Sequence, residues 1–134
     1  MLYYKLFGDI VIIHDGARPF IKSEYINNCV ETMNMFKGTT IAVRVKDTIK
    51  LSDNNKIVQN TFDRSKLWQI QTPQCFDKDV LLFGHKKCIK ENIDITDDCI
   101  ALELINEKIK IIEGDYSNIK ITTPEDLLLA QLIL

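Results

Sequence analysis

The strongest constraint on the fold is that short β-branched runs alternate with a helical pattern in the first third of the chain. Residues 10–13 (Ile-Val-Ile-Ile) form an uninterrupted apolar run, and residues 39–43 (Thr-Thr-Ile-Ala-Val) are typical of a second buried strand. Between them, apolar side chains recur every three or four positions over residues 24–35, after Ser23, which can cap a helix. Runs without alternation are typical of strands covered on both faces, so this order predicts strand, helix, strand in a parallel sheet.

The next segment follows a different pattern, which predicts a hairpin. Residues 48–51 and 56–59 alternate apolar with polar side chains on either side of a polar turn at residues 52–55. One face of such a hairpin is exposed to water, and an isolated two-stranded hairpin is marginally stable. We therefore expect this hairpin to lie on the sheet or on another subunit.

The second half of the chain adds strands and helices without a break. Strands are expected over residues 67–71, where Thr72-Pro73 ends the strand, and over residues 108–112 and 118–121. Helices are expected after three capping residues, from Asp77 to about Lys90, from Thr96 to about Asn106, and from Thr123 onward. No repeat, linker or domain boundary interrupts this pattern, so a single α/β domain is expected over residues 1–134.

Composition excludes several classes of protein. The 134 residues carry a formal net charge of −2, which argues against a dedicated nucleic-acid binder or a polybasic membrane binder. No apolar run approaches the ~18 residues of a membrane span, and residues 1–8 lack the features of a signal peptide. The four cysteines form no CxxC pair and are expected to be reduced, mostly buried thiols of a cytoplasmic protein.

Polar residues follow the first expected strand, where open α/β sheets bind ligands. Asp15 is well placed there for a metal ion or a sugar hydroxyl, and Gly16 lets a ligand approach the backbone. The alternative is a turn in which Asp15 caps backbone amides and Arg18 pairs with a surface acid. His14 closes the strand and is expected to be a hydrogen-bonded structural residue and not a base.

Four further positions leave two interpretations open. Arg64 can offer its planar guanidinium to a phosphate or form a surface ion pair with Asp63. Thr72 can contact a ligand or belong to a simple turn. Thr96 can help an anion bind at a helix N-terminus or only cap that helix. Lys120 can point inward as a phosphate ligand or lie solvated on an edge strand.

Five segments, in this order, are similar to the motifs of one enzyme family. They are HDGARP at 14–19, VKDTIK at 45–50, DRSKLW at 63–68 with QTPQCF at 71–76, TDD at 96–98, and NIKITTPEDL at 118–127. Together they resemble the 2-C-methyl-D-erythritol 4-phosphate cytidylyltransferases of the non-mevalonate isoprenoid pathway. The resemblance runs from about Gly8 to Leu134.

The resemblance implies a Rossmann-like nucleotidyltransferase fold of the glycosyltransferase-A type. Its sheet is expected to be mostly parallel, with a protruding hairpin arm at about residues 45–64 through which the family forms homodimers. The implied reaction is attack by the substrate's phosphate on the α-phosphorus of CTP, with Mg²⁺ balancing charge. The products are a CDP-linked methylerythritol and pyrophosphate.

The resemblance also assigns roles to residues of this chain. Asp15 would face the metal and the sugar hydroxyls beside Gly16, and Arg18 would contact the sugar alcohol. Thr96 and Lys120 would contact the methylerythritol phosphate. Arg64 and Thr72 would reach that substrate from the neighbouring subunit, and Arg64 with Lys120 would hold the nucleophile in line as the catalytic residues.

Two departures from the family pattern keep alternatives open. Gly16 stands where the family usually has Ala, which leaves more room at the site. The Gly-rich loop with an Arg and a Lys that wraps the CTP triphosphate is not found, so the domain is expected to be truncated at its N-terminus. The chain alone is then expected to bind CTP poorly. The alternatives are a pentitol-phosphate cytidylyltransferase and a non-catalytic remnant that binds phosphate or pairs with a full-length subunit.

Overall fold

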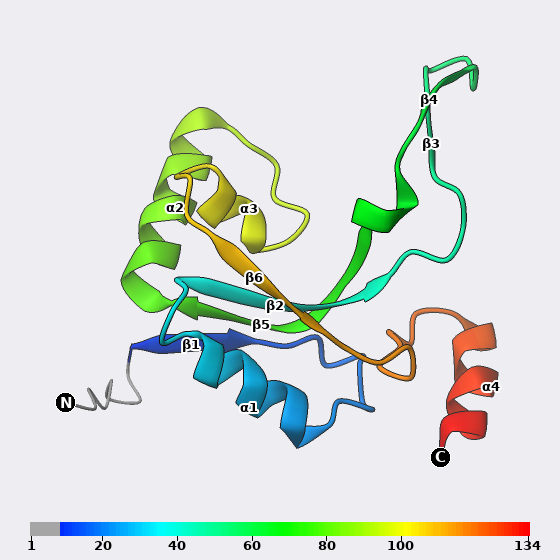
Figure 1. Ribbon diagram of the computed structural model, residues 1–134, viewed down its shortest axis with the longest axis horizontal. Coiled ribbons are helices and arrows are strands. Elements are labelled where there is room, and N and C mark those ends of the chain that lie inside the picture. The colour runs from blue at the N-terminus through cyan, green and yellow to red at the C-terminus, as the bar shows by residue number, and fades with distance from the viewer. Residues whose placement is uncertain (1–8) are drawn as a thin grey trace.

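A mixed four-stranded sheet with helices on both faces organises the chain. The computed structural model describes residues 9–134, and its chain path is shown in Figure 1. Across the sheet the strands are β1 (Ile10–Ile13), β5 (Trp68–Asp77), β2 (Gly38–Arg44) and β6 (Ile109–Glu113). The helices are α1 (Ser23–Thr32), α2 (Lys78–Glu91), α3 (Cys99–Glu103) and α4 (Pro124–Ile133).

The hydrophobic core lies on both sides of this sheet because adjacent residues of β5 point in opposite directions. Cys75 packs with Cys29 of α1 on one face, and Phe76 packs with Leu81 of α2 and Leu102 of α3 on the other. All four cysteines are buried free thiols, as the sequence predicts. Burial, with the nearby charge of Asp97, raises the pKa of Cys99 to about 12, so this thiol stays protonated.

The α/β architecture is confirmed, but the sheet differs from the expected one in its pairing. β2 and β6 pair in parallel, whereas the two strands expected to form a parallel sheet, β1 and β2, are not hydrogen-bonded to each other. β5 lies between β1 and β2 and runs antiparallel to both, so β1, β2 and β6 still point in one direction. The sheet is therefore mostly parallel in strand direction and mixed in its hydrogen-bonded pairs.

β5 does not end at Thr72-Pro73 as expected but continues through it to Asp77. Thr40 of β2 pairs with Gln74 and Ala42 pairs with Ile70, so the segment Gln71–Pro73 faces the single residue Ile41. This bulge gives Pro73 a place that needs no ladder hydrogen bond. It also frees Thr72 from the regular pleat.

The predicted hairpin forms a separate two-stranded sheet that projects from the body of the molecule (Figure 1). It consists of β3 (Lys50–Ser52) and β4 (Val58–Thr61), and the short 3-10 helix η1 (Arg64–Lys66) follows it. Both strands are exposed along their whole length. Exposed apolar residues of the arm are Ile49, Leu51, Ile57, Val58 and Phe62. The arm does not lie on its own sheet, which was one of the two expected placements.

Several local expectations are wrong in detail. α1 has Lys22 at its N-cap and no side-chain cap, so Ser23 is its first residue. Thr96 caps no helix, because α3 begins only at Cys99 with Asp98 at its N-cap. Residues 118–121 form no strand; they follow a turn at the end of β6. Two predicted caps are confirmed: Asp77 accepts hydrogen bonds from the first turn of α2, and Thr123 forms a capping box with Asp126 in α4.

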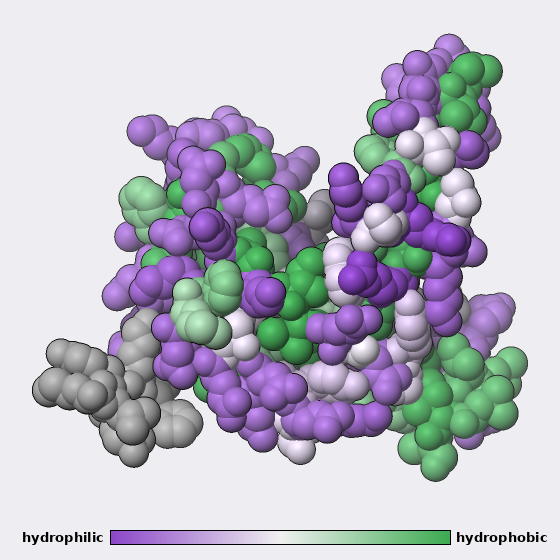
Figure 2. All heavy atoms as spheres, in the orientation of Figure 1, coloured by the Kyte–Doolittle hydropathy of each residue, from purple (hydrophilic) through white to green (hydrophobic). Residues whose placement is uncertain are grey.

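Helix α4 carries an unusual amount of exposed apolar surface. Figure 2 shows this patch as a green area at the lower right. The exposed residues are Leu127, Leu128, Leu129, Leu132 and Leu134. Among residues 9–134, no helix is both long and apolar enough to cross a membrane.

Candidate functional site

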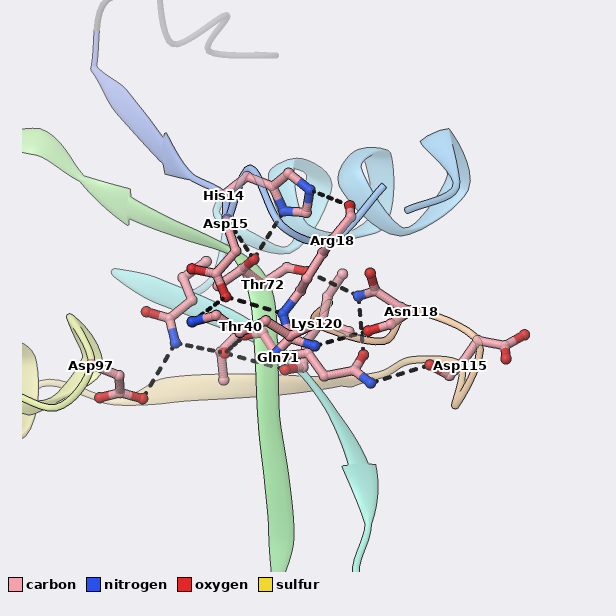
Figure 3. A network of polar contacts seen from close by, with 12 residues as sticks. His14, Asp15, Arg18, Thr40, Gln71, Thr72, Asp97, Asp115, Asn118 and Lys120 are labelled. Atoms are coloured by element: carbon pink, nitrogen blue, oxygen red, sulfur yellow. Dashed lines mark hydrogen bonds and ion pairs between the residues drawn. The ribbon is translucent and has the colours of Figure 1, made fainter. Parts of the chain in front are cut away.

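A cavity of about 400 Å³ opens where β1 ends beside the bulge of β5. The segment before α3 and the segment after β6 complete its wall. The lining residues are Ile13, Asp15, Arg18, Ile70, Gln71, Thr72, Gln74, Thr96, Asp97, Asp98 and Lys120. Figure 3 shows that most of its polar side chains belong to one connected network.

Asp15 is the centre of charge in this network. Its Oδ2 lies 3.1 Å from Nε of Arg18 and 3.3 Å from Nζ of Lys120. Burial alone raises the pKa of Asp15, but the hydrogen bonds and charges of Arg18 and Lys120 outweigh it and hold that pKa below its ordinary value. Asp15 is therefore a carboxylate at neutral pH, and it fixes both cations at the cavity wall.

Thr72 and His14 join the end of β1 to the bulge of β5. The backbone N–H of Asp15 donates to Oγ1 of Thr72 at 2.9 Å, and the same hydroxyl lies 2.9 Å from Nδ1 of His14. The other ring nitrogen of His14, Nε2, lies 3.1 Å from the carbonyl oxygen of Arg18. His14 is therefore hydrogen-bonded at both ring nitrogens, as predicted.

Asn118 holds the floor of the cavity together. Its side-chain amide donates to Oε1 of Gln71 at 3.1 Å and to the carbonyl of Thr72 at 3.0 Å, which the bulge leaves outside the ladder. The backbone carbonyl of Asn118 accepts a hydrogen bond from Nη1 of Arg18 at 2.8 Å. Asn118 is 1% exposed, and its Oδ1 has no partner among the described residues. One buried residue thus connects the bulge of β5, through its side chain, with Arg18, through its backbone carbonyl.

The opposite wall of the cavity is acidic. Gln74 donates to Thr40 at 3.2 Å and to Oδ2 of Asp97 at 3.3 Å. Asp98 lies 3.0 Å from Nε2 of His85 in α2. The lining then holds three carboxylates against the two cations Arg18 and Lys120. Such a cavity suits a ligand rich in hydroxyl donors, and a phosphate dianion needs further positive charge there.

Five of the seven site residues predicted from the sequence line this cavity. They are Asp15, Arg18, Thr72, Thr96 and Lys120. Thr72 lines the cavity of its own chain, and its expected contact with a neighbouring subunit's substrate stays a prediction. Gly16 follows Asp15 but is not part of the lining, and a Cβ added to it would meet nothing within 4 Å.

Arg64 lies apart from these residues. It begins η1 at the base of the arm, and its guanidinium donates to the carbonyl of Lys46. It is absent from the cavity lining. The single chain therefore does not bring the two predicted catalytic residues, Arg64 and Lys120, together.

Three polar residues that shape the site were not predicted from the sequence. Gln71 and Gln74 flank Thr72-Pro73, and they are only 6% and 2% exposed. A buried amide in a strand needs partners, so two glutamines in this segment were a signal that the strand runs through a polar network. Asn118 gave no such signal, because its partners depend on a bulge that strand periodicity does not predict.

The cavity is not a ready-made metal centre. Among residues 9–134, no three His, Cys, Asp or Glu side chains are arranged to hold a metal ion. The only contacts to the carboxylate of Asp15 from described residues are at Oδ2, so Oδ1 remains available to a ligand. Mg²⁺ commonly takes one or two protein carboxylates and completes its shell with water and substrate phosphates, and one free oxygen of Asp15 fits that kind of binding.

Comparisons with known proteins converge on one family. Residues 5–134 match the family described as 2-C-methyl-D-erythritol 4-phosphate cytidylyltransferase. The chain is 46% identical over 126 residues to the enzyme of that name from Caldanaerobacter subterraneus, covering 94% of this chain and 56% of that protein. It is 50% identical over 124 residues to the enzyme of that name from Clostridium beijerinckii, covering 92% of this chain and 55% of that protein.

Solved structures agree. The crystal structure of 4-diphosphocytidyl-2C-methyl-D-erythritol synthase from Anaerococcus prevotii superimposes with a TM-score of 0.85 at 36% identity, covering 92% of this chain and 57% of that one. The Francisella tularensis 2-C-methyl-D-erythritol 4-phosphate cytidylyltransferase gives a TM-score of 0.84 at 32% identity, covering 93% and 59%. The chain spans somewhat more than half the length of the relatives it matches. The family match over nearly the whole sequence and the agreement in fold show that this chain belongs to the 2-C-methyl-D-erythritol 4-phosphate cytidylyltransferase family.

Proposed function

We propose that this chain binds 2-C-methyl-D-erythritol 4-phosphate and contributes to its cytidylylation by CTP, which yields CDP-methylerythritol and pyrophosphate. The observation that carries the proposal is the single cavity in which Asp15, Arg18, Thr72, Thr96 and Lys120 come together from four separate segments. Relatives that share 46–50% of its residues bear the name of that reaction and not of a pentitol-phosphate transferase.

The chemistry asks the protein mainly to position two anions and to neutralise their charge. Lys120 supplies one cation at the cavity, and its ion pair with Asp15 keeps the ammonium group at the wall until a phosphate competes for it. Asp15, Thr72 and Thr96 offer oxygen acceptors to the hydroxyl groups of the sugar alcohol. Arg18 holds Asp15 in place and is itself held by the carbonyl of Asn118.

The positive charge that the cavity lacks would come from two groups. Arg64 from the arm of a second copy would add a guanidinium near the substrate phosphate, as the exposed arm and the distance of Arg64 from its own cavity suggest. Mg²⁺ bound to the CTP phosphates would add more, held on the protein side by Oδ1 of Asp15. The ion would neutralise charge on the triphosphate as pyrophosphate leaves. We propose a homodimer for this reason, and a cytoplasmic location in keeping with four free thiols.

Titration calorimetry with 2-C-methyl-D-erythritol 4-phosphate tests substrate binding directly. Lys120→Gln removes the cavity cation and is expected to weaken binding about tenfold or more, because a charged hydrogen bond contributes about 1.5–3 kcal/mol. The control is Lys86→Gln, which makes the same lysine-to-glutamine change at an exposed position of α2 outside the cavity. This variant is expected to bind the substrate like the parent. Equal losses in both variants, or no binding by a folded parent chain, would refute the proposed site.

A pyrophosphate-release assay with CTP, Mg²⁺ and the same substrate tests turnover. The triphosphate-wrapping loop found in the family is not recognisable in this sequence, so we expect the chain alone to bind substrate and to release little or no pyrophosphate. Turnover by the chain alone that Arg64→Ala abolishes would show that the loop is dispensable. If neither binding nor turnover occurs, the alternative of a non-catalytic chain that pairs with a full-length subunit is favoured. Mixing this chain with a complete relative and measuring whether the two associate would test that alternative.

A further inference from the structure

The hydrogen bonds of His14 determine whether the hydroxyl of Thr72 donates to its ring or accepts from it. A carbonyl oxygen only accepts, so the contact between Nε2 of His14 and the carbonyl of Arg18, 3.1 Å long, requires a proton on Nε2. In a neutral imidazole the other nitrogen, Nδ1, then has a lone pair and no proton. The hydroxyl of Thr72, 2.9 Å away, must donate to it.

The same hydroxyl already accepts one hydrogen bond. The backbone N–H of Asp15 donates to Oγ1 at 2.9 Å. A threonine hydroxyl has one proton and two lone pairs. With the proton directed to His14 and one lone pair taken by Asp15, a single lone pair remains for the cavity, which Thr72 lines.

We propose that His14 is a positioning residue that makes Thr72 a hydrogen-bond acceptor toward the cavity, so that Thr72 receives a hydroxyl group of the ligand and not a phosphate oxygen. The proposal deepens the proposed function, since it assigns the polyol part of a sugar-alcohol phosphate to the Thr72 end. The anionic part is then left to the end that holds Lys120.

The surroundings of Thr72 agree with this assignment. The backbone N–H that donates to Thr72 belongs to Asp15, whose carboxylate is an acceptor but lies between the cations Arg18 and Lys120. A phosphate oxygen placed at Thr72 would meet the remaining acceptor lone pair of its hydroxyl. A hydroxyl group placed there can donate to Thr72 and satisfy the remaining lone pair.

The first test measures the tautomer of His14 in the full chain. Two-bond ¹H–¹⁵N spectra of the histidine rings, recorded at pH 8, distinguish a proton on Nε2 from one on Nδ1, and a His85→Gln variant assigns the two histidines. We expect the neutral Nε2–H form for His14 in the parent chain. A neutral Nδ1–H form, or an imidazolium at this pH, would overturn the proposal whatever the chain binds.

The second test separates the two parts of the ligand with two probes, 2-C-methyl-D-erythritol and inorganic phosphate. Thr72→Val removes the hydroxyl and is expected to weaken methylerythritol binding about fivefold, as for one neutral hydrogen bond, with phosphate binding changed by less than about twofold. Thr72→Ser keeps the hydroxyl and is expected to bind both probes like the parent. A larger loss for phosphate than for methylerythritol in Thr72→Val would contradict the proposal.

His14 itself is tested by rescue. His14→Ala removes the acceptor and is expected to lower the ratio of methylerythritol to phosphate affinity. In His14→Asn the amide oxygen stands as far from Cβ as Nδ1 does, and we expect it to restore most of that ratio. Failure of the parent chain to bind either probe would count against the proposed function, and the tautomer measurement would still decide the role of His14.

Discussion

Gly16 and Gly84 differ in the space that each leaves for the Cβ of an alanine. At Gly16 an added Cβ would find no heavy atom within 4 Å, and no glycine among the described residues has a positive φ. At Gly84, in α2, the added Cβ would lie 2.3 Å from the backbone carbonyl oxygen of Ala101 in α3. This clash would force α2 and α3 apart. The first site has room for the alanine of the family pattern, and the second does not.

We therefore predict opposite results for two alanine variants in urea unfolding. Gly16→Ala should leave the free energy of unfolding unchanged or raise it by up to about 1 kcal/mol, because alanine restricts the unfolded chain. Gly84→Ala should lower it by about 1–3 kcal/mol, because the two helices must separate. A destabilised Gly16→Ala would mean that the turn after β1 needs glycine for a reason the surrounding atoms do not reveal.

Asp115 gives a pH dependence whose sign can be stated. Hydrogen bonds from the backbone and side chain of Ser117, and then Lys22, lower its pKa to about 2. A carboxyl with a lowered pKa stabilises the fold above its unfolded pKa, near 4, and loses that contribution as the pH falls toward 2. Both partners of the ion pair with Lys22 are more than one-third exposed, so the contribution is small.

The matching variant is Asp115→Asn, which keeps the shape and removes the charge. Near pH 7 we expect it to be less stable than the parent by at most about 1 kcal/mol. Between pH 4 and pH 2 the two unfolding curves should converge. A gap that stayed constant down to pH 2 would show that the charge of Asp115 contributes nothing.

At the scale of elements, strands whose signal lies within their own segment were easy to predict, and the strand whose path depends on its partner was not. β1, β2, β6, the hairpin and helices α2 and α4 follow from apolar periodicity and capping residues within each segment. The path of β5 through Pro73 was missed, since a proline breaks a regular ladder and only the bulge opposite Ile41 admits it.

The same contrast holds for the site. Family motifs identified five of the residues that line the cavity, because a motif records residue types at fixed spacing. Their mutual arrangement was not predictable in this way. Only the antiparallel insertion of β5 beside β1 puts Thr72 next to Asp15 of the same chain.

Asn118 allows the bulge to be tested as an element. Asn118→Ala leaves Oε1 of Gln71 and the carbonyl of Thr72 without their donor in a buried place. We expect a loss of about 1–3 kcal/mol in the free energy of unfolding, together with weaker binding of methylerythritol phosphate. Asn54→Ala, in the exposed turn of the arm, is the control and should change neither quantity. A stable Asn118→Ala variant would show that the bulge holds without this clamp.

At the scale of the whole molecule, apolar surface outside the cores predicts association. α4 exposes Leu128 by 64% and Leu132 by 84%, and the arm adds further exposed apolar side chains. Contiguous apolar surface of this kind favours contacts between molecules. We expect sedimentation to show association that grows with protein concentration.

The double variant Leu128→Lys/Leu132→Lys tests how much the exposed face of α4 contributes to that association. Both side chains are largely exposed, so the circular dichroism spectrum should stay as in the parent while the weight-average mass falls. Lys substitution on the arm at Ile57 and Val58 tests the other exposed area in the same way. An unchanged mass in the α4 variant would assign the association to the arm.

The insertion of β5 between β1 and β2 also has a consequence for how the chain folds. The cavity closes through contacts between residues far apart in the sequence: Asp15 with Thr72 across 57 positions, and Arg18 with Asn118 across 100. Contacts of such separation form late, because each must overcome the entropy of closing a long loop. The pocket should therefore be absent from any partly folded form that lacks β5 or the segment after β6. A ligand seated in it would slow hydrogen exchange throughout the sheet and not only at the residues it touches.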